Sequence, residues 1–164
     1  MEIREAIASD WDLIFPFFSA ILEEGRTYAM PPGLSSDDAR PLWMESPPGR
    51  TVVALEGASL LGTAKMGPNR PGRGSHIATA SFMVNPDFGG RGVGHALGVY
   101  VVDWARAEGY VGIQFNAVVE TNEVAVRAWE KLGFTIIGTV PKAFQHPDDG
   151  LVGLHVMFFD LTSG

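Results

Sequence analysis

Five glycines surround a single arginine in the stretch PDFGGRGVGHALG, which spans residues 86–98. It directly follows the apolar run IATASFMV at 77–84 and leads into a segment whose apolar residues recur at helical spacing. A glycine-rich turn between a strand and a helix leaves several backbone N–H groups unpaired at the positive end of the helix dipole. Such a turn can bind a phosphate group, because no Cβ holds the anion away from the backbone.

The glycines alone leave two interpretations open, a phosphate site or a tight turn that binds nothing. A P-loop is disfavoured, because His95 and Ala96 follow Gly94 where that motif needs Lys and then Ser or Thr. A dinucleotide-binding fold is disfavoured as well, because its glycines follow the first strand of the fold and three predicted strands precede this one.

GGRGVG at 89–94 and NEVAVRAWEKLGF at 122–134 are two separate motifs, and together they resemble the GNAT superfamily of acetyl-CoA-dependent N-acetyltransferases. GGRGVG at 89–94, preceded by VNP at 84–86, is similar to the phosphate motif of that family. Gly89 stands where the family usually has Gln or Arg, which leaves the backbone donors in place. NEVAVRAWEKLGF, which ends at Phe134, resembles the family's Asn-x-x-Ala followed by an aromatic residue and Glu-Lys-Leu-Gly-Phe. Both the order and the spacing of the two motifs agree with the family.

The resemblance implies acetyl-CoA as co-substrate, bound in a V-shaped opening between the strands at 76–84 and 111–118. The pantetheine arm would pair with backbone groups of the first strand, and the pyrophosphate would contact the amides of 90–95. Asn122 would offer its amide to the arm, or serve only as a helix N-cap. The residues implied to bind the cofactor are Phe82, Met83, Val84, Gly89, Gly90, Arg91, Gly92, Val93, Gly94, His95, Asn122, Ala125 and Trp129.

Three residues are candidates for catalysis. A backbone N–H near Val84 would meet the thioester carbonyl, as the resemblance implies. Trp129 stands where the family commonly has a proton-donating tyrosine; an indole N–H cannot give up its proton, so Trp129 would polarise the sulfur or pack beside it. Asn116, inside the apolar run IQFNAVV, is expected to be a buried amide that binds the acceptor or ties to nearby backbone. Strand 76–84 supplies no carboxylate base, which favours direct attack by the amine.

The acceptor site is placed by the resemblance around residues 24–30 and near Phe144. Arg26, Tyr28, Phe144 and His146 are candidates, and each is also interpretable as a surface or packing residue. Residues in the segment from 120 to 141 are similar to a subgroup that includes a fungal acetyltransferase of azetidine-2-carboxylate and related proline analogues. The expected acceptor is therefore a small amine such as an amino acid. A protein or peptide N-acetyltransferase and a catalytically silent acyl-CoA-binding module are the alternatives.

The overall composition limits the partners. Twelve basic against 19 acidic residues give a net charge of −7, which disfavours binding to nucleic acid. The absence of cysteine excludes disulfides and thiolate zinc sites, and the four histidines lack the spacing of metal ligands. No apolar run approaches the length of a membrane span, so we expect no membrane partner and a cytoplasmic location. A homodimer is compatible with such a domain.

The elements that must position these residues follow from the hydrophobic periodicity. Strands are predicted at 2–7, 51–55, 60–66, 76–84, 111–119, 134–140 and 153–161, and helices at 11–22, 92–108, 122–132 and from 35 to near Pro47. A loop is predicted after 140. Hairpins and crossovers both occur in this order, which predicts one α/β (α+β) domain over 1–164. The resemblance adds that its mixed, mostly antiparallel sheet is splayed between two parallel strands, with helices on both faces.

Overall fold

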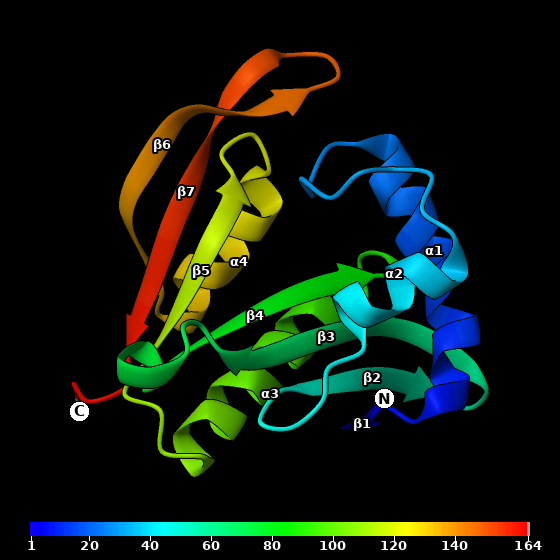
Figure 1. Ribbon diagram of the computed structural model, residues 1–164, viewed down its shortest axis with the longest axis horizontal. Helices are drawn as coiled ribbons and strands as arrows, with labels where there is room; N and C mark the ends of the chain where they lie inside the picture. The colour runs from blue at the N-terminus through cyan, green and yellow to red at the C-terminus, as the bar shows by residue number, and fades with distance from the viewer. Residues whose placement is uncertain (164) are drawn as a thin grey trace.

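The computed structural model describes residues 1–163, which fold around one seven-stranded sheet (Figure 1). Its strands are β1 (Glu2–Glu5), β2 (Arg50–Glu56), β3 (Ser59–Pro68), β4 (Ile77–Val84), β5 (Gly112–Val119), β6 (Thr135–His146) and β7 (Gly150–Asp160). Its α-helices are α1 (Trp11–Glu24), α2 (Ser36–Trp43), α3 (Val93–Ala107) and α4 (Glu123–Leu132). The predicted order of strands and helices is confirmed.

The sheet has the strand order β1-β2-β3-β4-β5-β7-β6, and every neighbouring pair is antiparallel except β4 and β5. This parallel pair is in register at only two positions, Ile77 with Gly112 and Ala78 with Ile113. Beyond these positions the two strands diverge toward their C-terminal ends (Figure 1). The predicted splay between two parallel strands is therefore confirmed.

Helices cover both faces of the sheet, as the sequence predicted. Alternation along β2 shows this directly, because Val52 and Val53 are both fully buried but belong to different cores. Val52 packs in the core formed with α3 and α4, and Val53 packs in the core formed with α1 and α2. β3 and β4 also contribute residues to both cores, such as Ala64 and Ala78 to the first and Leu60 and Met83 to the second. This packing on both faces holds the edge of β4 that faces β5 in place.

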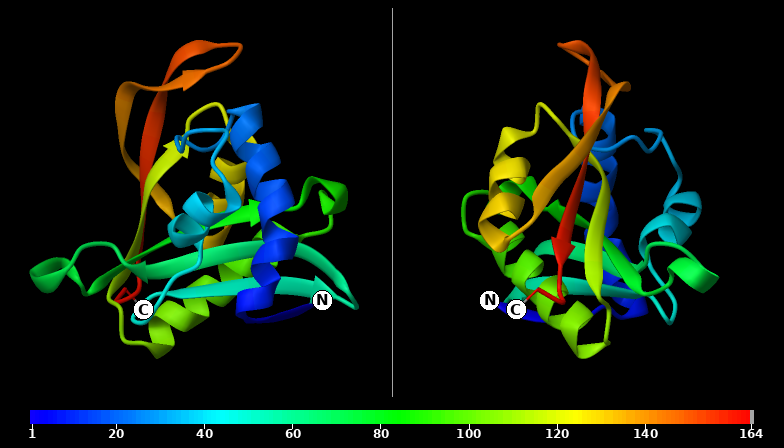
Figure 2. Two further views of the ribbon diagram at one scale, coloured as in Figure 1. Left: turned by 45° about the vertical axis from the view of Figure 1, so that its right-hand side comes forward. Right: turned by 90° about the vertical axis from the view of Figure 1, so that its left-hand side faces the viewer.

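The predicted loop after residue 140 is a strand over much of its length, so that prediction was wrong. β6 runs to His146 and pairs with β7 in a long hairpin, interrupted by a register shift between Val140 and Phe144. Pro141 falls within this shift, where its missing N–H breaks no regular ladder bond. The hairpin extends above the sheet toward the loop that follows α1, as three views agree (Figures 1 and 2).

Candidate functional site

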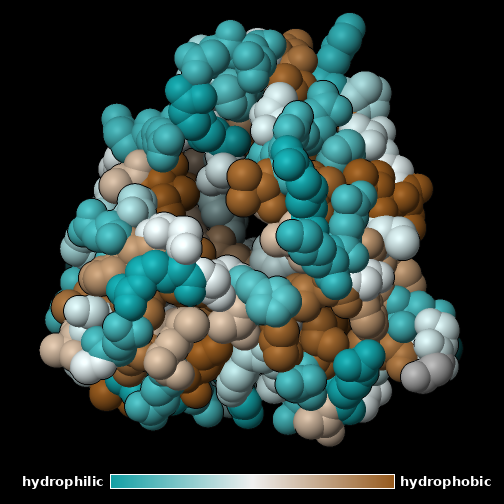
Figure 3. All heavy atoms as spheres, turned by 180° about the vertical axis from the view of Figure 1, so that it is seen from behind, coloured by the Kyte–Doolittle hydropathy of each residue, from teal (hydrophilic) through white to brown (hydrophobic). Residues whose placement is uncertain are grey.

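A cleft of about 690 Å³ opens where β4 and β5 separate. β4 and β5 form its walls together with Asn122, Ala125 and Trp129 of the α4 segment, and the loop after α1 covers one side. Seen from behind, the surface is hollowed near its centre between apolar and polar side chains (Figure 3). Pro86, two residues after the end of β4, also lines the cleft and is the lining residue nearest in sequence to the glycine-rich loop.

The glycine-rich loop presents free backbone donors at the start of α3. Gly90 and Gly92 have positive φ angles of 75° and 76°, and a Cβ built on either would meet no atom within 4 Å. The first helical bond of α3 runs from the Ala96 N–H to the Gly92 carbonyl at 3.0 Å. Within residues 1–163, the amides of 90–95 have no backbone or side-chain acceptor, so they can converge on one anion.

Arg91 makes a local ion pair beside this loop. Its Nη2 lies 2.6 Å from Oε1 of Glu56, the last residue of β2, and its guanidinium lies 5.7 Å from the centre of the Phe88 ring. The hydrogen bond to Arg91 holds the pKa of the Glu56 carboxyl below its ordinary value. The positive charge of Arg91, a residue predicted to bind the cofactor, is therefore shared with Glu56. The backbone amides of 90–95 are the principal donors to a phosphate group.

Tyr28, from the loop after α1, contacts the edge of β4 that faces the cleft. The Tyr28 hydroxyl accepts a hydrogen bond of 2.9 Å from the Phe82 N–H and donates one to the Phe82 carbonyl. Val84 has the same orientation as Phe82, two residues along the strand, and faces the gap between the strands. Met83 faces the other way: its backbone is paired opposite Thr63 of β3, and its side chain, 2% exposed, lies in the core under α1.

The opposite wall of the cleft is the first part of α4. The Asn122 side chain accepts a hydrogen bond of 3.3 Å from the Ala125 N–H, so it is an N-cap, and both residues line the cleft. Trp129 also lines the cleft and is 8% exposed. Its ring packs against Phe82 at 4.5 Å and Phe115 at 5.1 Å between centroids.

The profile of the Acetyltransferase (GNAT) family matches residues 12–134, most of the chain. This chain belongs to the GNAT family. The resemblance predicted from the glycine-rich loop and from the segment that ends at Phe134 is therefore confirmed.

Solved structures and a curated protein agree with this membership. A GCN5-related N-acetyltransferase from Kribbella flavida is 54% identical, with a TM-score of 0.95 over 98% of this chain and 97% of that chain. A phosphinothricin acetyltransferase from Sinorhizobium meliloti, solved in complex with acetyl-CoA, is 18% identical, with a TM-score of 0.88 over 99% of this chain and 89% of that chain. N-acetyltransferase aca1 from Schizosaccharomyces pombe is 39% identical over 85 residues, which are 52% of this chain and 41% of that protein.

Trp129 occupies a packing position in this GNAT chain. We expect Trp129→Phe to lower the free energy of unfolding by about 1–2 kcal/mol, because it leaves space beside Phe82 and Phe115. The turnover number should stay within about threefold of the wild type, since an indole N–H gives up no proton. Chemical denaturation and steady-state kinetics measure the two quantities. A loss of turnover near 100-fold, with stability unchanged, would assign Trp129 a direct part in the chemistry.

Asn116 is exposed, so the prediction of a buried amide was wrong. β5 and β7 shift register between Phe115 and Val118, and this bulge leaves both intervening residues exposed. The Asn116 amide donates to Oδ1 of Asn69 at 2.7 Å, and its Oδ1 accepts from Gln114 at 2.9 Å. Asn116 still lines the cleft, on the side away from the glycine-rich loop.

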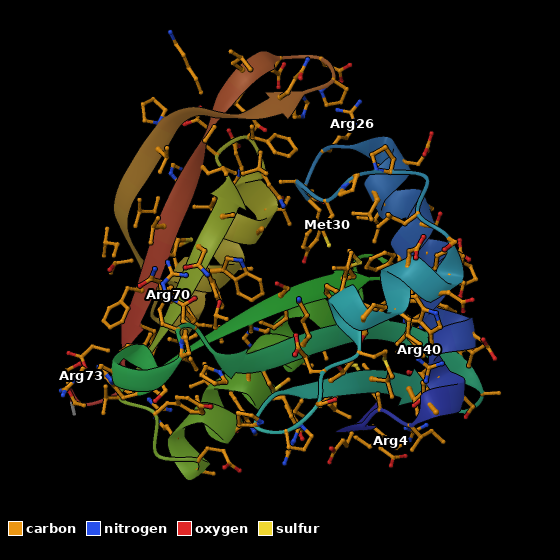
Figure 4. The ribbon with its side chains drawn as sticks, in the orientation of Figure 1. Arg4, Arg26, Met30, Arg40, Arg70 and Arg73 are labelled. Carbon is orange, nitrogen blue, oxygen red and sulfur yellow. The ribbon has the colours of Figure 1, made fainter. Side chains whose placement is uncertain are left out.

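Three of the acceptor candidates lie outside the lining of the cleft. Arg26 pairs with Asp148 at 2.6 Å, which ties the loop after α1 to the β6–β7 hairpin (Figure 4). Phe144 is 6% exposed and packs in a separate cluster with Val119 and Val152. His146 is 7% exposed, and its Nδ1 accepts from two backbone amides of the hairpin turn. Arg26 and His146 therefore shape the hairpin that overhangs the cleft.

Two further residues line the cleft: Met30, which the sequence placed only as the end of the acceptor loop at 24–30, and Lys65, which was not predicted. Met30 points from the loop after α1 into the gap above β4 (Figure 4). Lys65 lines the cleft and also a smaller adjoining cavity of about 360 Å³. Its Nζ donates to the Leu42 carbonyl at 2.7 Å and lies 3.5 Å from a carboxylate oxygen of Glu45. In the sequence, Lys65 is a single lysine within a predicted strand, and nothing near it indicated that it lines a cleft.

Among residues 1–163, no group of three or more His, Asp or Glu is placed to hold a metal ion. None of the helices in that part of the chain is long and apolar enough to cross a membrane.

Proposed function

We propose that this protein transfers the acetyl group of acetyl-CoA to the amine of a small molecule. One observation supports the proposal above all: six consecutive backbone amides without acceptors, at 90–95, follow Pro86, which lines the cleft opened by the splay of β4 from β5. The amides suit a diphosphate and the cleft suits an extended arm. The acetyl-CoA complex of the Sinorhizobium meliloti structure, which shares this fold, supports the same choice of ligand.

Groups of this chain can bind each part of acetyl-CoA along the cleft. The amides of 90–95 hold the diphosphate, and the N–H and C=O of Val84, which face the gap, pair with the arm. The same Val84 N–H is our candidate donor to the thioester carbonyl oxygen, in which case only the Val84 carbonyl pairs with the arm; that donor would stabilise the negative charge that develops on the oxygen. Asn122 and Ala125 confine the arm from the side of α4.

We infer that the acceptor amine attacks directly, from the side of the cleft that Lys65 and Asn116 line. The amine must arrive neutral and lose a proton as the new bond forms. Thr79 and Ser81 of β4 face this side and offer no carboxylate. Glu45, however, lines the adjoining cavity and pairs with Lys65 at 3.5 Å, so Glu45 or water takes the proton. An amino acid or an analogue fits a cavity of about 360 Å³ that adjoins the cleft.

The acceptor side is tested by Asn116→Ala. We expect kcat/KM for the acceptor to fall by about 10-fold, in the range of one lost hydrogen bond, because Asn116 lines both cavities. The dissociation constant of acetyl-CoA should stay within about twofold of the wild type, since the diphosphate and the arm are held elsewhere. Calorimetry and kinetics on the same preparation provide both numbers. A parallel loss of acetyl-CoA binding would place Asn116 on the donor side instead.

Thiol release from acetyl-CoA, measured with a panel of amines, amino acids and basic peptides, tests the proposed function. Turnover confined to small amines supports it. Turnover on peptides alone would favour a protein N-acetyltransferase, and binding of acetyl-CoA without turnover on any acceptor would favour a silent binding module. The homodimeric state, the cytoplasmic location and the extent of the single domain stay predictions from the sequence.

A further inference from the structure

Among residues 1–163, Lys65 is the one cation that lines the cleft or the cavity beside it. Carboxylates line these two spaces at Glu24 and Glu45. Glu24 pairs with Arg26 in the loop after α1, at 3.4 Å, and Glu45 lies beside Lys65. Within this part of the chain, a negative group of a ligand can therefore meet a lining cation only at Lys65.

The ammonium group of Lys65 keeps donors for a ligand. It has three N–H groups, and one of them donates to the Leu42 carbonyl at 2.7 Å. Oε1 of Glu45 lies 3.5 Å from Nζ, which is long for a hydrogen bond between charged groups. The Lys65 side chain is 27% exposed and that of Glu45 is 37% exposed, so an incoming group can reach both. An anion in the adjoining cavity can therefore bind the ammonium without taking the donor that Leu42 uses.

Two hydroxyl groups lie beside Lys65 on the same face of the sheet. Lys65 of β3 is paired directly opposite Ser81 of β4, and Thr79 lies two residues from Ser81 on that strand. The Cβ atoms of directly opposite residues are about 4.5–5.5 Å apart, and side chains two residues apart share a face. Ser81 and Thr79 line both cavities, and neither hydroxyl has a hydrogen-bond partner within the described chain. An ammonium and two hydroxyls without partners thus form one row of donors.

We propose that this row, Lys65 with Ser81 and Thr79, binds the carboxylate of an α-amino acid whose amine the enzyme acetylates. The ammonium neutralises the carboxylate, and the hydroxyls donate to its oxygens. The amine and the carboxylate of an α-amino acid are bonded to one carbon, so the amine then lies near Glu45, a group able to take its proton. The inference rests on the proposed function and names the group by which the acceptor side distinguishes amino acids from other small amines.

The test compares the common L-amino acids with their carboxamides as acceptors, by thiol release from acetyl-CoA. The amide keeps the side chain and the amine but lacks the charge that Lys65 is to bind. We expect the wild type to favour the free acid by about 10-fold or more in kcat/KM, the range of one hydrogen bond to a charged group. Lys65→Gln should bring this ratio below about twofold and leave the dissociation constant of acetyl-CoA within about twofold. The pKa of the amine differs between acid and amide, but equally for every variant, so this difference cancels between variants.

Ser81→Ala tests the same row without touching the contact between Lys65 and α2, and should lower the ratio by about threefold.

Lys131→Gln is the matched control, because it removes the same charge from an exposed position on α4 that lines neither cavity. It should keep the wild-type ratio of acid to amide. A ratio that is unchanged in Ser81→Ala and in any folded Lys65→Gln would overturn the inference. Wild-type turnover that ignores the carboxylate, or that occurs only on amines without one, would also overturn it and leave the proposed function standing. No turnover on any small amine would instead refute the proposed function.

Discussion

Replacing Gly92 with aspartate will weaken the binding of acetyl-CoA by about 100-fold, which corresponds to about 2.7 kcal/mol. Gly92 is the N-cap of α3 and has a φ of 76°, where a residue with a Cβ is strained by about 1–2 kcal/mol. The new carboxylate would also stand among the amides that are to hold the diphosphate and repel it. Isothermal titration calorimetry with acetyl-CoA measures the change directly.

Gly72→Asp is the matched control for this prediction. Gly72 has a φ of 60° and, like Gly92, no atom within 4 Å of an added Cβ, but it lies in the loop between β3 and β4. Both variants carry comparable backbone strain and the same added charge, so only the position relative to the amides of 90–95 differs. Equal affinities for the wild type and a folded Gly92→Asp would show that the diphosphate binds elsewhere.

The donor side of the site was predictable from the sequence because its signals are local. A glycine-rich turn, the strand before it and the helix after it are contiguous, so their residue types specify free amides at a helix start without knowledge of the rest of the fold. Asn122 is a similar case, since a cap and the helix that it begins are neighbours in the sequence. The positions of both motifs at one cleft came from the resemblance to a family; in the structure Asn122, Ala125 and Trp129 line the cleft, and the glycine-rich loop follows Pro86, which lines it too.

The acceptor side could not be predicted in the same way, because its geometry depends on distant pairings. Asn116 interrupts an apolar run, and strict alternation cannot show that a bulge against β7 exposes it. Phe144 was assigned to a loop, whereas its pairing with Val152 in the hairpin buries it. Tyr28 bonds to Phe82, 54 residues away, through a loop with no periodicity, so nothing near Tyr28 in the sequence indicates its partner.

We expect the largest effect on stability from a substitution at the junction between α4 and β6. We expect Gly133→Ala to lower the free energy of unfolding by about 2–4 kcal/mol and the Tm by about 5–15 °C. Gly133 ends α4 with a φ of 116°, and a Cβ there would lie 2.0 Å from Cε2 of Phe159. The Phe159 ring cannot move aside freely, because it packs 5.3 Å from the Phe134 ring and beneath the guanidinium of Arg106 at 5.5 Å.

Gly138→Ala separates this effect from the general cost of adding a methyl group. Gly138 lies in β6, and an added Cβ would meet no atom within 4 Å, so we expect its Tm to stay within about 2 °C of the wild type. Thermal unfolding of both variants followed by circular dichroism makes the comparison. Because Gly133 holds the C-terminal end of the helix that carries Trp129 into the cleft, the folded fraction of Gly133→Ala should also bind acetyl-CoA more weakly. An unchanged Tm would mean that Phe159 and α4 shift apart at little cost, and α4 would then be a movable wall of the cleft rather than a fixed one.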